Sequence, residues 1–293
     1  MSVKTVNYSG IKNRSGSGMS RAGTKKRSSV QTGEAGQRLL KAGHRIVELA
    51  WYLFLPAIIL LIWEIVCVTG IVPAYSMPSP QKVVTAAIGH IQDGTLIQNI
   101  GASFLRVLEG FLIACILGLG LGIVTGLSRR AERFTELTFQ ILKPIPPIAW
   151  IPLAILWFGI GEASKLFIIF LGAFFPILLN TVSGIHGIDG RYLELARVYE
   201  IDRRQLILKI ILPGAMPSIL TGIRVGLGNA WVCVVAAEMI AATKGIGFML
   251  SNGRSLSRPD DVILGMLLIG VVGKLLDDIL KALSGKITAR NRQ

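Results

Sequence analysis

The feature that most limits what this chain can fold into is a series of apolar segments, each close to the length that crosses a lipid bilayer. A membrane-spanning helix needs about 20 mostly apolar residues. Six segments meet or approach this requirement: residues 49–68, 104–127, 135–159, 166–185, 217–242 and 262–283. Only 16% of the 293 residues are charged, whereas soluble domains carry about a quarter. We therefore predict an all-α, polytopic membrane protein with about six transmembrane helices.

Glycine is abundant, at 33 residues, and the mean hydropathy is +0.59. Small residues let helix backbones approach closely inside a bilayer, where one leucine gains little by exchanging lipid for another leucine. The composition therefore predicts tightly packed spans in a lipid environment.

The distribution of basic residues predicts the orientation. Short loops rich in Lys and Arg stay in the cytoplasm. With the N-terminus inside, the inner ends and loops carry 14 Lys and Arg residues near the spans, and the outer loops carry 5. We expect the chain to lie in the inner membrane of the cell, with both termini in the cytoplasm. The same distribution accounts for the net charge of +14 without a nucleic-acid partner.

The chain divides into a membrane domain and two tails. Residues 1–45 are rich in Ser, Gly, Lys and Arg and lack apolar periodicity, which is typical of a disordered segment. We expect them to form a basic cytoplasmic tail rather than a signal peptide, because no small-residue cleavage site follows the first apolar run. Residues 46–285 form the predicted membrane domain, and residues 286–293 form a second cytoplasmic tail.

Nothing in the sequence indicates a catalytic or metal-binding constellation. The phosphate-binding pattern GxxxxGK[ST] is absent, and cysteines and histidines are scattered without metal-ligand spacing. These residues are Cys67, Cys115, Cys233, His44, His90 and His186. We predict that the chain is not an enzyme, holds no metal or cofactor, and takes its energy from another subunit.

The outer loop after the first span carries a helix start. Ser79 precedes Pro80, and Ser at the N-cap with Pro at the first helical position is a favourable combination. Apolar residues at helical spacing follow, among them Val83, Val84 and Ala87. We expect an amphipathic helix on the outer face.

The inner loop, residues 186–216, carries two further helix starts. Asp189 can cap a helix over residues 191–199, and Asp202 can cap a second, with Gln205 completing a capping box. A structured loop of this length is usually functional. The residues leave two interpretations open: a helix-turn-helix that contacts a cytoplasmic partner, or a helix that lies on anionic lipid.

This loop resembles the signature loop of bacterial ABC-importer permeases. The family pattern is Glu-Ala-Ala, three residues, Gly, nine residues, Ile, one residue, Leu-Pro. This chain matches it at Glu194, Ala196, Ile210, Leu212 and Pro213. It departs at Leu195, where the family has Ala, and at Glu200, where it has Gly. A turn at that position needs a positive φ, which Glu adopts poorly.

Other blocks extend the resemblance over residues 50–285. MPSP, LKPIPPIAWIPLAILWFGIG, AFFPILLNT and AAEMIAATKGIGFML look like the nitrate, sulfonate, taurine and bicarbonate branch of these permeases. The resemblance implies a type I permease architecture and import of a small anion, with sulfonate or taurine favoured and nitrate or bicarbonate next. It also implies a homodimer, two cytoplasmic ATPases that bind the ATP, and an extracytoplasmic binding protein. The implied ATPase-coupling residues are Glu194, Leu195, Ala196, Arg197, Glu200, Leu212 and Pro213.

Charged residues and prolines inside the apolar runs are candidates for a transport path. Arg224 and Glu238 lie about 21 Å apart along one helix face, so they cannot pair directly. Both have two interpretations: contact with the anion or a gate, or structural pairing with other spans. The prolines at Pro146 and Pro147 interrupt the regular helix and predict a kinked third span, which either lines a gate or is simply packed.

Three other charged residues have mainly structural interpretations. Glu64 lies in the first predicted span, and Arg106 and Glu109 are three residues apart, which allows them to pair on one helix. An ion-gradient-driven carrier or channel is the alternative function. It would need ion-binding carboxylates near the midplane, and Glu64 and Glu238 are isolated in the sequence.

Overall fold

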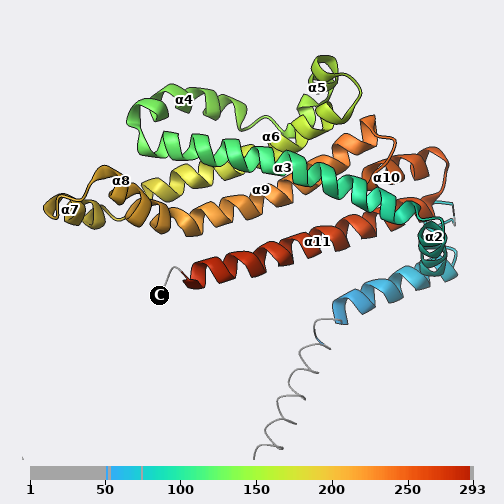
Figure 1. The fold of residues 1–293 in the computed structure, drawn as a ribbon. Coiled ribbons are helices and arrows are strands. Elements are labelled where there is room, and N and C mark those ends of the chain that lie inside the picture. The colour runs from blue at the N-terminus through green and yellow to red at the C-terminus, as the bar shows by residue number, and fades with distance from the viewer. Residues whose placement is uncertain (1–50, 52–53, 74, 291–293) are drawn as a thin grey trace, which may run out of the picture. The chain divides into compact units, whose positions relative to one another are not determined.

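The computed structural model describes residues 51, 54–73 and 75–290, and these form helices joined by short connections (Figure 1). No strand occurs among these residues, as the all-α prediction requires. The chain divides into two units, residues 1–62 and 63–293. An apolar helix, Phe54–Val68, crosses this boundary. The predicted tail over residues 1–45 lies outside the described residues.

The elements of the second unit follow one another along the chain with few long gaps. They are α2 (Pro80–Gln92), α3 (Thr95–Leu127), α4 (Arg129–Leu142), the 3₁₀ helix η1 (Pro147–Trp150), α5 (Ile151–Phe158), α6 (Glu162–His186), α7 (Gly190–Val198), α8 (Arg203–Leu206), the π-helical turn η2 (Ile207–Ile211), α9 (Leu212–Ala241), α10 (Ile246–Ser255) and α11 (Pro259–Arg290).

Three helices are long and apolar enough to cross a membrane: α3, α6 and the continuous helix Arg203–Ala241. A fourth span exists if α4 and the segment Pro147–Phe158 count as one, but these are bent by 86°. The predicted third span is therefore broken rather than kinked. Phe54–Val68 is shorter than a span, and α11 carries five charged residues in its second half. Length and composition thus identify three or four of the six predicted spans among the described residues.

The core forms where α6 packs against α3 and α9 (Figure 1). Its buried side chains come from these three helices and from Ile246 of α10, with Phe111, Ile177 and Trp231 among the larger ones. Glycines allow the close approach. A Cβ on Gly122 would stand 2.8 Å from Cβ of Thr181, and one on Gly226 would stand 2.9 Å from a methylene of Ile177. The expectation of small residues at helix contacts is confirmed.

Two groups of short helices lie at opposite ends of the long ones. α2 and α10 lie at one end, and α7 and α8 lie at the other (Figure 1). α2 begins at Pro80, as predicted, with Ser79 as an extended N-cap residue. The Ser79 side chain makes no capping hydrogen bond, so the proline and the backbone geometry start this helix. The predicted outer helix and the predicted inner loop are therefore separated by the full length of the spans.

Candidate functional site

The inner loop forms two short helices, started by the aspartates that the sequence indicates. Asp189 Oδ1 accepts a hydrogen bond of 3.0 Å from the Arg191 backbone N–H, at the start of α7. Asp202 Oδ2 accepts one of 3.1 Å from the Arg204 N–H, at the start of α8. A π-helical turn then joins α8 to α9. Both predicted N-caps are confirmed.

The turn between these helices contains Glu200 at φ 49°. The Ile201 N–H donates to the Ala196 carbonyl at 2.9 Å. A residue with positive φ followed by this bond is a Schellman cap, whose positive-φ position usually holds glycine. The expected turn is therefore present, and Glu200 adopts a backbone conformation that costs an L-residue about 1 kcal/mol or more.

α7 presents an exposed surface on one side and a buried one on the other. Glu194 is exposed, and Leu195 exposes 53% of its surface next to Tyr192 and Val198. Ala196 exposes only 3%, so its methyl group packs within this chain. Burial shows that this methyl group is covered by the chain itself, and its contact with an ATPase stays a prediction. Arg197 lies in α7, in the same turn as Glu194.

The helices α7 and α8 with the turn between them are called the elbow below. Leu212 and Pro213 do not belong to it and begin α9. Pro213 lines a pocket of about 550 Å³ together with Tyr192 of α7 and Lys209 of the π-helical turn. A rigid proline at the first turn of a helix is well tolerated, because that turn needs no donor there. These two residues therefore join the elbow to the long span.

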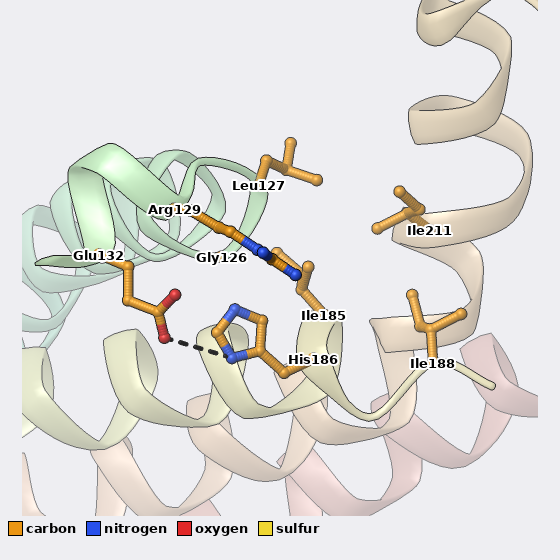
Figure 2. A pocket seen from close by; sticks show the side chains of 8 residues that line it. All are labelled: Gly126, Leu127, Arg129, Glu132, Ile185, His186, Ile188 and Ile211. Atoms are coloured by element: carbon orange, nitrogen blue, oxygen red, sulfur yellow. Dashed lines mark ion pairs between the residues drawn. The ribbon is translucent and has the colours of Figure 1, made fainter. Parts of the chain in front are cut away.

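A second pocket, of about 490 Å³, lies between the end of α3, the start of α4, the end of α6 and the π-helical turn (Figure 2). Its walls come from the α3–α4 turn, the end of α6 and Ile211. His186 Nδ1 lies 3.7 Å from Glu132 Oε1 across the pocket, and Arg129 extends toward the same space (Figure 2). The pair of His186 and Glu132 joins the end of α6 to α4.

Glu238 lies in a polar cluster between α3, α9 and the start of α10. It exposes 1% of its surface. Its carboxylate accepts hydrogen bonds from Ser103 Oγ at 2.8 Å, Arg106 Nη1 at 2.7 Å and the Gly247 N–H at 2.9 Å. A charge buried in a membrane helix needs such partners. Glu238 thus ties the connection between α9 and α10 to α3.

Arg106 is the centre of this cluster and extends it to α6. Its guanidinium donates to Glu162 through Nε at 2.6 Å and Nη2 at 2.9 Å, and to the Lys244 carbonyl at 2.6 Å. Lys165 Nζ donates to the same Glu162 at 2.8 Å. The positive charges of Arg106 and Lys165 therefore equal in number the negative charges of Glu162 and Glu238. The predicted pairing of Arg106 with Glu109 is wrong, because partners on neighbouring helices bind Arg106 instead.

Arg224 and Glu238 do not contact each other, in agreement with the spacing. Arg224 forms an ion pair with Asp277 of α11, at 2.5 Å and 2.6 Å. Glu64 Oε1 accepts a hydrogen bond of 2.8 Å from Gln81 at the start of α2, and Glu64 Oε2 is buried without a partner. The side chains of Arg224 and Glu64 are therefore engaged with neighbouring helices.

The proline-rich break lies beside the long spans. Pro146 is exposed in the connection and Pro147 begins η1. Pro147 and Lys143 line a pocket of about 370 Å³ that α6 and α9 close on the other side. Sequence reasoning selected the prolines but not Lys143, Ser103 or Glu162. A polar residue within or beside an apolar run was the available signal for all three.

Within the described part of the chain, no group of three or more His, Cys, Asp or Glu side chains could hold a metal ion. The thiols of Cys67, Cys115 and Cys233 are free. The absence of a cofactor stays a prediction from the sequence.

Comparison with known proteins gives the family. A family described as the binding-protein-dependent transport system inner membrane component matches residues 116–287, which is more than half of the chain. The chain belongs to this family. It is a permease component of a membrane transport system, and the apolar spans place it in the inner membrane as a multi-pass protein.

Individual relatives agree. A protein of Bacillus subtilis named as an aliphatic sulfonates transport permease is 41% identical over 80% of this chain and 85% of its own length. The taurine transport system permease protein of Escherichia coli is 35% identical over 79% of this chain and 86% of its own. The bicarbonate transport system permease protein of Synechococcus elongatus is 35% identical over 74% of this chain and 82% of its own length. These matches place the chain in the predicted branch.

Among solved structures, an inward-facing form of the MetNI methionine ABC transporter matches with a TM-score of 0.60. The match covers 67% of this chain and 98% of that one, at 16% identity. At this identity the match supports the fold, which is the type I permease architecture that the sequence predicts.

Proposed function

We propose that this permease imports a small oxyanion, with organic sulfonates favoured and nitrate or bicarbonate next. The relatives are named for aliphatic sulfonates, taurine and bicarbonate. Alkanesulfonates and taurine carry a sulfonate head group, and bicarbonate is a small oxyanion as well. The sequence block Trp157–Lys165 looks closest to the sulfonate and taurine members.

We further propose that α7 is the docking surface for a cytoplasmic ATPase. The observation that carries this proposal is the exposed row of Tyr192, Leu195 and Val198 on a helix held by its own Schellman cap. Exposed apolar groups on a rigid element are typical of an interface. The ATPase binds the ATP, and this chain has no nucleotide-binding or catalytic site of its own.

The remaining partners follow from the family. Two copies of the chain line the transport path, two ATPases bind the two elbows, and an extracytoplasmic binding protein delivers the anion. The distribution of basic residues supports a cytoplasmic location for both termini and α7. Glu200, Leu212 and Pro213 keep the elbow rigid and connected to α9, so ATPase closure moves the span.

The test is coupling in the reconstituted system of this chain, its ATPase and its binding protein. Leu195→Asp places a charge on the docking surface. Loss of an interface anchor costs about 2 kcal/mol or more, so ATPase binding should weaken by about thirtyfold. Val84→Asp on α2, where Val84 is equally exposed, is the matched control at the opposite end.

The expected result is that Leu195→Asp abolishes ATP-driven uptake of labelled ethanesulfonate, whereas Val84→Asp leaves ATPase binding intact. ATP depletion should stop uptake and a proton uncoupler should not. Uptake that survives ATP depletion but stops with the uncoupler would replace this proposal with an ion-gradient carrier.

A further inference from the structure

The pocket at the broken span has one cationic and two amide groups in an otherwise largely apolar wall. Its volume is about 370 Å³, within the range of small-ligand sites. α4, α6 and α9 supply the polar groups, and the break supplies part of the apolar wall. The residues used below are Lys143, Asn180, Asn229, Ile145, Pro147 and Phe175.

This pocket lies well inside the membrane rather than at its edge. Lys143 follows the 14 residues of α4, which span about 21 Å from the basic start of that helix. Gly172 lies near the middle of the 25-residue α6. A Cβ on Gly172 would be 3.3 Å from the backbone oxygen of Asn229. Asn229 is therefore close to the midpoint of the spans.

Lys143 differs from the other cations in these helices. Arg106 and Lys165 pair with Glu162, Arg224 pairs with Asp277, and Lys274 pairs with Asp278. In the described part of the chain, the exposed ammonium of Lys143 makes no hydrogen bond or ion pair. No acidic residue lines this pocket, and the carboxylates of Glu132 and Glu136 line an adjoining pocket that Lys143 also lines. An unpaired cation at this depth is costly against lipid. The pocket therefore belongs to a polar path, with a net positive charge.

The two amides complete an anion-binding arrangement. Asn180 donates one amide hydrogen bond to the Pro176 carbonyl at 2.8 Å, which fixes its side chain to α6. Asn229 is exposed on α9. An amide has two N–H donors, so both can donate to an oxyanion while Asn180 keeps its helix contact.

We propose that this pocket binds the transported oxyanion, with Lys143 as the residue that selects negative charge. The proposal rests on the proposed function and adds the site. Lys143, Asn180 and Asn229 bind the sulfonate oxygens, and Ile145, Pro147 and Phe175 contact the carbon chain. An apolar wall of this kind suits an organic sulfonate better than nitrate.

The first test needs neither ATP nor the partner proteins. Asn229→Cys is introduced, and the rates of reaction are measured with two thiol reagents: the anionic 2-sulfonatoethyl and the cationic trimethylammonioethyl methanethiosulfonate. The parent chain supplies the background from Cys67, Cys115 and Cys233. With Lys143 present, the ratio of anionic to cationic rate should exceed that in Lys143→Met by about tenfold, from the field of one nearby charge.

Two variants control this measurement. Lys143→Arg keeps the charge and should keep the ratio, and Lys281→Met removes an exposed lysine on α11 and should not change it. A ratio that is the same with Lys143→Met as with native Lys143 would overturn the proposal.

The second test is uptake of labelled ethanesulfonate by the complete transporter. Lys143→Met should reduce uptake at least tenfold, and uptake at the native level would overturn the role of Lys143. If the native transporter takes up no anion but the reagent ratio depends on Lys143, the proposed function fails and the anion site stands.

Discussion

The cluster around Arg106 permits a quantitative prediction. Arg106→Met leaves Glu238 with 1% exposure, two neutral donors and no cation. Removing one partner of a buried ion pair costs about 3–5 kcal/mol, because the other charge stays buried. Loss of the Glu162 contact adds about 1 kcal/mol or less, since Glu162 exposes 59% of its side chain and keeps Lys165. We expect a loss of about 4 kcal/mol in the free energy of unfolding.

The double variant Arg106→Met/Glu238→Met separates charge from packing. It removes both buried charges, and the Ile246 N–H keeps its bond to Ser103 Oγ at 2.9 Å. The Gly247 N–H and the Ser103 hydroxyl both lose the Glu238 carboxylate as acceptor. The hydroxyl can rotate toward another acceptor, whereas the unpaired N–H costs about 1–3 kcal/mol. The double variant should therefore be more stable than Arg106→Met alone.

The assay is unfolding of the purified chain in detergent micelles by titration with dodecyl sulfate, followed by the fluorescence of tryptophan, including the buried Trp231. Arg254→Met, at an exposed position on α10, is the control and should stay within about 0.5 kcal/mol of the native chain. A cost below about 1 kcal/mol for Arg106→Met, or a double variant less stable than this single one, would refute the reasoning.

Two further predictions concern backbone positions. Glu200→Gly should raise the free energy of unfolding by about 0.5–1 kcal/mol, because glycine relieves the positive φ at some cost in unfolded-state entropy. Glu200→Val should lower the free energy of unfolding. If chemical denaturation showed Glu200→Val to be more stable than Glu200→Gly, this account of the turn would be contradicted. Gly245→Ala should destabilise by about 3 kcal/mol or more, because its φ is 132° and a Cβ there would overlap the Glu238 carboxylate. Gly101→Ala, which meets open space in α3, should be neutral or stabilising in the same measurement, and equal effects at the two glycines would exclude the proposed clash.

Local patterns predicted the local structure well. The uncharged runs became α3 and α6, Asp189 and Asp202 capped the two short helices, and the departure from glycine at Glu200 identified the strained turn. Each of these features depends on residues within a few positions of one another, so spacing alone contains the information.

The contacts that hold the spans together could not be predicted in this way. Arg106 has a carboxylate three residues away, but its partners Glu162 and Glu238 are 56 and 132 residues distant. Likewise, the 86° bend of the third span and the burial of Ala196 depend on how helices pack. A list of prolines or a family motif indicates that a break or a loop exists, and packing decides which side chains face outward.

The docking of an ATPase on α7 is tested most directly by cross-linking. Leu195→Cys and Val84→Cys are each co-purified with the ATPase in the native complex and treated with a short bifunctional thiol reagent. Both side chains are exposed, and the helices that carry them, α7 and α2, lie at opposite ends of the long helices (Figure 1). We predict a covalent adduct with the ATPase from Leu195→Cys and none from Val84→Cys. An adduct from Val84→Cys alone would contradict the account, because the ATPase would then bind the end of the molecule that carries α2.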